Sequence, residues 1–109
     1  MSANLYWFTG LSGAGKTTVA SIFYKTLKKS KDCIIFLDGD ALRELLTDEQ
    51  LYSKVERKKL AMRYSILCKM FIDQGIDVVI ATISMFHEVK EWNRCNIKNY
   101  IVELYKAKY

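Results

Sequence analysis

The fold of this chain is decided by the stretch Leu5-Tyr6-Trp7-Phe8-Thr9-Gly10-Leu11-Ser12-Gly13-Ala14-Gly15-Lys16-Thr17. Residues 5–8 form a short apolar and aromatic run that leads into Gly10, which is typical of a buried strand. Residues 10–17 satisfy the phosphate-binding pattern G-x-x-x-x-G-K-[ST]. Beyond them, apolar side chains recur at helical spacing, at Val19, Ile22, Phe23 and Leu27. The stretch therefore predicts a strand, a glycine-rich turn and a helix, which is the context that the pattern requires.

The glycine-rich turn predicts a site for nucleotide phosphates. Its glycines let successive backbone N–H groups point at phosphate oxygens, and the start of the helix adds a partial positive charge. Lys16 is expected to reach the β- and γ-phosphates, and the Thr17 hydroxyl to help hold Mg²⁺. The alternative is a glycine turn without a ligand. We expect ATP to be bound by the turn and the first helical residues, namely Gly10, Leu11, Ser12, Gly13, Ala14, Gly15, Lys16, Thr17 and Thr18.

The rest of the chain alternates between strand and helix patterns. Apolar runs at residues 33–37, 76–81 and about 100–104 predict three further strands. Helices are predicted at residues 41–46, at about 53–74 with an end at Gly75, and around Phe86, Val89 and Trp92. Strands separated by helices predict an α/β fold, a parallel sheet with helices on both faces and right-handed crossovers. Without a linker or repeat, residues 1–109 are expected to form one domain.

Composition narrows the classes of protein further. Half of the 109 residues are apolar, 27% are charged and the net charge is +5, which suits a globular domain with a solvated basic face or a polyanionic substrate. No apolar run approaches the roughly 20 residues of a membrane span, and the N-terminus lacks the features of a secretion signal, so a cytoplasmic location is expected. Cys33, Cys68 and Cys95 are odd in number and widely separated, so we expect buried small side chains instead of disulfides or a metal site.

Two carboxylates follow the second predicted strand, in Asp38-Gly39-Asp40. Ligands of open α/β sheets bind beyond the carboxyl ends of the strands, so these groups are expected to face the phosphate site. A carboxylate there could hold Mg²⁺ or accept the proton of an attacking hydroxyl. The alternative is a turn with a cap for the helix near Ala41. Beside the phosphate motif, we favour the ligand role.

Polar and basic side chains elsewhere are weaker candidates. Thr82-Ile83-Ser84 ends the third predicted strand, where no acidic residue occurs, and this favours a small kinase over a motor-type ATPase. Ser84 could contact a substrate phosphate or cap the next helix. Arginines suit bidentate contacts with phosphate or sulfate oxygens, so Arg43 and Arg57 are favoured as ligands, whereas Lys58 and Lys59 are expected to be solvated. His87 is the only histidine and is a weak candidate for a general base.

The motif Phe8-Thr9-Gly10-Leu11-Ser12-Gly13-Ala14-Gly15-Lys16-Thr17, with Leu37-Asp38-Gly39-Asp40, Arg43 and Ile83-Ser84, resembles the adenylylsulphate kinases, which are P-loop enzymes. The resemblance covers nearly the whole chain. It implies a P-loop NTPase fold of three α/β/α layers and transfer of the γ-phosphoryl of ATP to the 3′-hydroxyl of adenylyl sulfate, in sulfate assimilation. It implies catalytic roles for Lys16, Asp38 and Ser84, a metal site at Thr17 and Asp38, and substrate contacts from Asp40, Arg43, Arg57, Arg63, Ile83 and Ser84.

The departures from the family pattern all lie on the acceptor side. Leu60 stands where the family usually has Asn, Met62 replaces one of a pair of arginines, Met85 follows Ile83-Ser84 in place of proline, and His87 replaces Arg after an aromatic residue. Residues 91–100 look like those of divergent kinase-like proteins of bacterial polysaccharide clusters, some of which phosphorylate cytidine diphosphoramidate. A kinase of such a nucleotide, and an ATP-binding module without transfer activity, are therefore alternatives to an adenylyl sulfate kinase.

Members of this family normally continue beyond the fourth strand with a basic lid and a further strand. The present sequence stops soon after that strand, so we expect a C-terminally short kinase domain in which the adenine is poorly enclosed and ATP hydrolysis exceeds transfer. The expected partners are a small-molecule nucleotide and, as an assembly, a homodimer. Nucleic acid is not expected as a partner, because the aromatic residues do not interleave with the basic ones. A membrane is not expected either, because no apolar run is long enough to span one.

Overall fold

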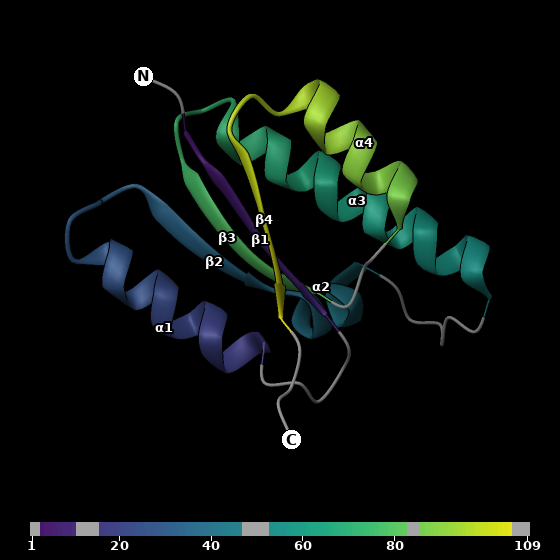
Figure 1. Cartoon of the computed structure of the whole chain (residues 1–109), viewed down its shortest axis with the longest axis horizontal. Helices are drawn as coiled ribbons and strands as arrows, with labels where there is room; N and C mark the ends of the chain where they lie inside the picture. Colours follow the sequence, from purple (N-terminus) through teal and green to yellow (C-terminus); the bar gives the residue numbers. More distant parts are fainter. Residues whose placement is uncertain (1–2, 11–15, 47–52, 83–85, 106–109) are drawn as a thin grey trace.

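The computed structural model describes residues 3–10, 16–46, 53–82 and 86–105. Within these ranges strands and helices alternate, as β1 (Leu5–Gly10), α1 (Lys16–Lys28), β2 (Ile34–Asp38), α2 (Gly39–Leu46), α3 (Lys54–Ile72), β3 (Asp77–Thr82), α4 (His87–Asn96) and β4 (Tyr100–Tyr105). The strands form one parallel sheet in the order β2-β3-β1-β4. The predicted α/β fold and each predicted strand are confirmed (Figure 1).

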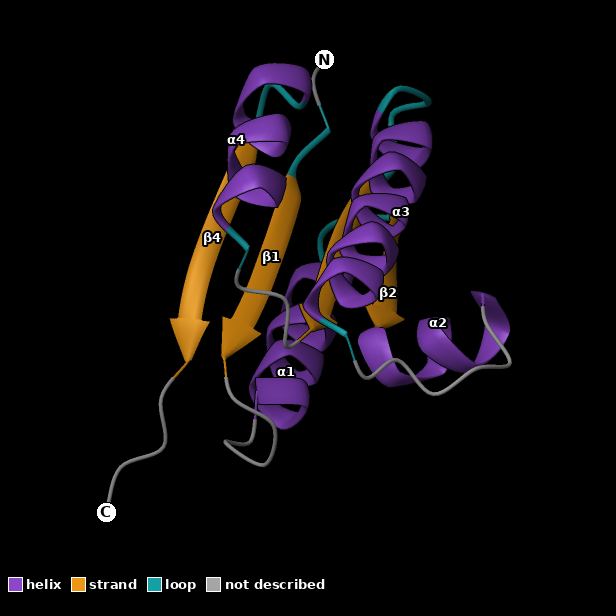
Figure 2. Cartoon of the chain, turned by 90° about the vertical axis from the view of Figure 1, so that its right-hand side faces the viewer, coloured by secondary structure: helices purple, strands orange, loops and turns teal. Residues whose placement is uncertain are grey.

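Helices cover both faces of the sheet because its strands are apolar on both sides. Leu5 and Trp7 of β1 belong to a core that also contains residues of α3 and α4, such as Tyr64 and Val89. Phe8, the next residue along β1, packs instead in a second core with side chains of α1. The alternation follows from the two-residue period of a strand. The result is three layers, with α3 and α4 on one face and α1 on the other (Figure 2).

The parallel register brings the carboxyl ends of three strands to one edge of the sheet. Thr9 of β1 pairs with Thr82 of β3, and Asp38 of β2 pairs with Ala81. Helix α2 begins at the residue after Asp38, so it lies at this same edge (Figure 1). In parallel α/β sheets this is the edge that carries ligands, and the candidate site is found there.

The ends of α3 are set by local sequence. Ser53 is the N-cap, and its hydroxyl accepts a hydrogen bond of 3.1 Å from the backbone N–H of Glu56, which satisfies one of the free donors of the first turn. The helix ends at Ile72, and Gly75 follows with a φ of 83°, a conformation that glycine adopts without steric cost. The predicted start near residue 53 is confirmed, whereas the helix ends at Ile72, two residues before the predicted end at residue 74.

Two expectations about burial are wrong. Cys68 is buried, and desolvation raises the pKa of its thiol to about 12, but Cys33 and Cys95 are exposed. Cys33 precedes the first residue of β2, so it does not share the burial of the strand. Ile22 of α1 is 60% exposed, although its spacing placed it with the apolar stripe. Of the helices in the described ranges, none is long and apolar enough to cross a membrane.

A buried carboxylate links three segments at the amino-terminal ends of the strands, opposite the candidate site. Asp77, the first residue of β3, accepts a hydrogen bond of 2.9 Å from the backbone N–H of Asn4. Its other oxygen lies 2.6 Å from the ammonium group of Lys31. The Asp77 side chain is almost completely buried, whereas Lys31 is partly exposed. Asp77 therefore ties the segments before β1 and β2 to the start of the central strand β3.

Candidate active site

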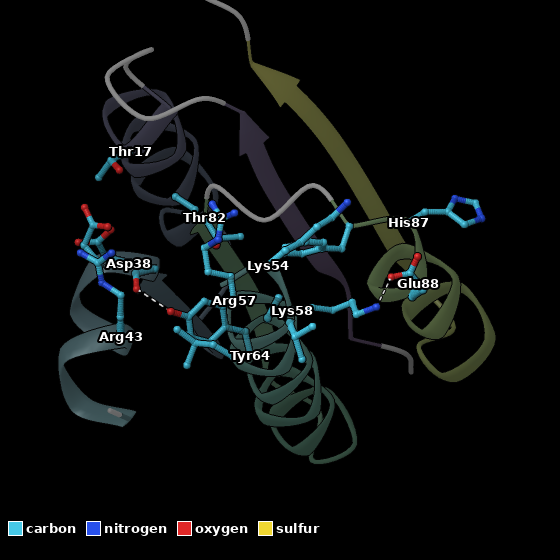
Figure 3. Close-up of a pocket in the computed structure, with 17 residues that line it drawn as sticks. Thr17, Asp38, Arg43, Lys54, Arg57, Lys58, Tyr64, Thr82, His87 and Glu88 are labelled. Carbon is cyan, nitrogen blue, oxygen red and sulfur yellow. Dashed lines mark hydrogen bonds and ion pairs between the residues drawn. The ribbon is translucent and has the colours of Figure 1, made fainter. Parts of the chain in front are cut away.

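One pocket of about 680 Å³ lies at the carboxyl edge of the sheet. Its lining comes from the first turn of α1, the β2–α2 junction, the first half of α3, the end of β3 and the start of α4. The crossovers of the parallel sheet deliver all of these segments to one place. Figure 3 shows the lining side chains in three groups: those near Thr17 and Asp38, those from α3, and those from α4.

The acidic side of the pocket carries Thr17, Asp38 and Asp40. Asp38 is half-buried at the end of β2, while Thr17 and Asp40 are exposed. Carboxylate and hydroxyl oxygens are the ligands that Mg²⁺ accepts in proteins. The structure thus brings Thr17 and Asp38, the two predicted metal ligands, to one pocket.

Gly39 places these carboxylates by allowing a close approach of two backbones. A Cβ atom on Gly39 would lie 2.7 Å from the carbonyl oxygen of Ala81 and 3.1 Å from the Cα atom of Thr82. Backbone atoms cannot move aside as a flexible side chain can, so any larger residue would push α2 away from the end of β3. Gly39 therefore lets the start of α2 rest directly on β3.

The basic side of the pocket is formed by Arg43 of α2 and by Lys54, Arg57 and Lys58 of α3. Arg43 and Arg57, the arginines favoured as ligands, both line the pocket. Arg63 does not line it and is exposed on α3. The geometry therefore brings two of the three predicted substrate arginines together, and it offers no support for a substrate contact from Arg63.

The sequence indicated that Lys58 would be solvated, but in the structure it forms an ion pair. Its ammonium group lies 2.9 Å from a carboxylate oxygen of Glu88 on α4, and both residues line the pocket. The hydrogen bond from Lys58, followed by its charge, lowers the pKa of Glu88. His87, beside Glu88, also lines the pocket, but its ring points away from the other labelled side chains (Figure 3).

Tyr64 forms part of the pocket wall and contacts the acidic side directly. Its ring is 4% exposed, and its hydroxyl donates a hydrogen bond of 3.1 Å to the carbonyl oxygen of Gly39. Burial, the largest cause, raises the pKa of Tyr64 to about 12, with opposing smaller effects from Arg43 on one hand and Asp40 and Asp38 on the other. The Tyr64 hydroxyl is protonated at neutral pH, as tyrosines ordinarily are, and it is the donor of this hydrogen bond.

The phosphate motif is described only at its two ends. Gly10 ends β1 and is buried, Lys16 begins α1, and Thr18 is exposed in the first turn of α1. That turn contains no acidic residue, so nothing there opposes the partial positive charge of the helix start. Leu11, Ser12, Gly13, Ala14 and Gly15, together with Ile83 and Ser84, lie outside the described residues, and their predicted roles stay predictions.

Several pocket residues were missed by sequence reasoning. Lys54, Tyr64 and Glu88 had been given no part in the site, and Leu60 had been noted only as a departure from the family pattern, but all four line the pocket. One signal could have found the α3 residues: Arg57, Leu60, Ala61 and Tyr64 follow one another at helical spacing. A helix that carries one ligand at its start presents the residues three, four and seven positions later on the same face.

The layered parallel sheet, with a phosphate motif before α1 and carboxylates after β2, defines the class of P-loop nucleotide-binding proteins. A model of the adenylylsulphate kinase family matches residues 2–108. The chain therefore belongs to the adenylylsulphate kinase family, and the resemblance seen in its motifs is confirmed.

Relatives of this chain are named as kinases of two different nucleotides. The chain is 42% identical, over 88% of its length, to a cytidine diphosphoramidate kinase of Campylobacter jejuni. It is 34% identical, over 90% of its length, to an adenylyl-sulfate kinase of Deinococcus deserti. It spans 56% and 54% of these two relatives, so it corresponds to about half of their length.

Solved structures agree with the fold. The APS kinase of Mycobacterium tuberculosis in complex with AMPPNP and APS superimposes with a TM-score of 0.80 at 29% identity. The match covers 94% of the present chain and 62% of that structure. The fold class of this chain is thus the fold of a known nucleotide kinase.

Proposed function

We propose that this chain binds ATP at the start of α1 and transfers the γ-phosphoryl group to a hydroxyl of a small anionic nucleotide. The observation that carries the proposal is that one pocket holds Thr17, two carboxylates and two arginines directly beyond a phosphate-binding motif. Membership of the adenylylsulphate kinase family supports the same reaction class.

The residues present fit Mg²⁺ and ATP phosphates. Thr17 and Asp38 offer hydroxyl and carboxylate oxygens in one pocket, and these are the donors that Mg²⁺ prefers. When bound, Mg²⁺ would neutralise charge on the phosphates. Lys16 follows the glycine-rich turn, and we propose that its ammonium group reaches the same phosphates.

The chain's own side chains would act mainly by positioning and charge. Asp38 would orient the acceptor hydroxyl and take its proton. The acceptor oxygen then forms a bond to the γ-phosphorus as the bond to the oxygen of the departing ADP breaks. Arg43 and Arg57 would hold the anionic end of the acceptor, with Asp40 beside them, and we propose that Ser84 and Ile83 contribute from the loop after β3.

Adenylyl sulfate is the first candidate acceptor, because the chain belongs to the adenylylsulphate kinase family. Cytidine diphosphoramidate is the second, and one specific observation favours it. Leu60, which stands where the family pattern usually has Asn, is buried in the wall of the pocket. An apolar wall at this point removes a hydrogen-bonding group from the acceptor site, and the relative at 42% identity is a kinase of that second nucleotide.

The test is phosphoryl transfer from ATP and Mg²⁺ to each of the two nucleotides, with wild type and Lys16→Ala compared. We expect one acceptor to be phosphorylated with the higher kcat/KM, and the Lys16→Ala variant to lose transfer. ATP binding by the wild type without phosphorylation of either acceptor would refute transfer and leave an ATP-binding module, whose affinity for ATP the same variant would lower.

A further inference from the structure

Among the described residues, one buried side-chain hydrogen bond joins α3 to the segment that carries the two pocket carboxylates. Tyr64 of α3 donates this bond. The acceptor of this bond is the carbonyl oxygen of Gly39, the residue between Asp38 and Asp40. A buried phenol hydroxyl usually has a polar partner, and Figure 3 shows this bond as a dashed line between Tyr64 and the backbone beside Asp38.

The Asp38–Asp40 segment is therefore held from two sides. On one side, Gly39 rests against the backbone of β3, with room for no Cβ atom. On the other side, the Tyr64 hydroxyl fixes the Gly39 carbonyl at 3.1 Å. This placement matters for the proposed reaction, because a shift of a reacting group by about 1 Å can lower a rate about 100-fold. A small shift of Asp38 or Asp40 relative to Thr17 would therefore be enough to impair transfer.

We propose that Tyr64 is a positioning residue, whose hydroxyl holds Gly39 so that Asp38 and Asp40 face the phosphate end of the pocket. This inference rests on the proposed phosphoryl transfer. Tyr64 does not touch the reacting atoms in this account. It acts through the Gly39 carbonyl, and its loss changes the placement of the carboxylates while the ring still fills the wall of the core.

The variant that isolates this role is Tyr64→Phe, which keeps the ring and removes only the hydroxyl. Tyr100→Phe is the matched control, because Tyr100 packs against Trp7 and its buried hydroxyl does not line the pocket. Three quantities are measured for wild type and both variants of the full chain: the melting temperature, the ratio of ATP affinities with and without Mg²⁺, and kcat and acceptor KM.

We expect Tyr64→Phe to lower kcat by about ten-fold or more, with the acceptor KM changed far less, because only the positioning of the carboxylates is lost. The gain in ATP affinity on adding Mg²⁺ should shrink as well, since Asp38 would lose its place in the pocket that it shares with Thr17. Tyr100→Phe should leave the kinetic constants and the Mg²⁺ ratio at their wild-type values. The thermal unfolding curves show whether the variants remain folded at the assay temperature.

Wild-type kcat and a wild-type Mg²⁺ ratio in Tyr64→Phe would overturn the inference, and so would equal kinetic losses in both variants. If the wild type itself transfers no phosphoryl group, the proposed function fails on that result alone. The role of Tyr64 is then decided by the Mg²⁺ ratio, with the same two outcomes.

Discussion

The ammonium group of Lys58 on α3 lies 2.9 Å from the carboxylate of Glu88 on α4, and the two residues line the same pocket. The pair joins the two helices at their N-terminal ends. It also neutralises a cation that would otherwise be available to an anionic acceptor, so Glu88 is expected to compete with the acceptor for Lys58.

Glu88→Gln should therefore strengthen acceptor binding. Because an exposed ion pair is worth little, the expected fall in acceptor KM is roughly two- to five-fold at low salt, and smaller at high salt. The measurement is the acceptor KM at two ionic strengths. Glu91→Gln is the control, since Glu91 pairs with Arg94 on α4 outside the pocket. An unchanged or higher KM in Glu88→Gln would contradict the competition.

Gly39→Ala should disrupt both stability and transfer. The added Cβ would lie 2.7 Å from the Ala81 carbonyl oxygen, and forcing it in is expected to cost about 1–3 kcal/mol of unfolding free energy. Denaturant unfolding and kcat measure the two effects. Gly75→Ala separates them, because its Cβ meets nothing within 4 Å and only its φ of 83° is unfavourable. This second variant should lose stability and keep kcat, and a similar loss of kcat in both would contradict the contact.

Asp77→Ala should destabilise the fold at the amino-terminal ends of the strands. It leaves the backbone N–H of Asn4 without the acceptor that it has at 2.9 Å, and an unsatisfied, partly buried donor costs about 1–3 kcal/mol. Urea unfolding measures the change. Asp73→Ala is the matched variant, because the exposed pair of Asp73 with Lys69 should contribute less than about 1 kcal/mol. Equal losses in the two variants would be inconsistent with the anchoring role of Asp77.

The Lys31–Asp77 pair also predicts a pH dependence. The hydrogen bond to Asp77, and next the charge of Asp77, raise the pKa of Lys31 above 10.5. A raised pKa means that the pair stabilises the fold fully below the unfolded value and loses this effect as the pH rises through the folded value. The difference in melting temperature between wild type and Lys31→Met should therefore be constant near neutral pH and shrink above pH 10.5. A difference that grows at high pH would contradict this sign.

The sequence predicted the layers of the fold because the strands carry apolar residues on both faces and the helices follow short turns. Residues 5–8 and 78–81 are continuous apolar runs, and both became central strands flanked on each side by helices. Thr17, Asp38, Arg43 and Arg57 were found as pocket residues for a related reason. Each follows or opens an element at the carboxyl edge, and topology alone brings that edge together.

What the sequence did not predict depends on contacts between distant elements. The partner of Lys58 lies 30 residues away on another helix, and no local pattern points to Glu88. Tyr64 has the spacing of a core residue, and the direction of its hydroxyl depends on where α2 starts. The exposure of Ile22 likewise depends on how wide a face of α1 the sheet covers.

The most direct measurement of the central claim follows the γ-phosphoryl group itself. ATP labelled at the γ-phosphate is incubated with Mg²⁺, the full chain and each acceptor nucleotide, for wild type and Asp38→Asn. We predict label in the acceptor with wild type and about 100-fold or greater loss of that transfer with Asp38→Asn, as expected for a group that takes the hydroxyl proton. Label found only in inorganic phosphate, or equal transfer by both proteins, would contradict the account.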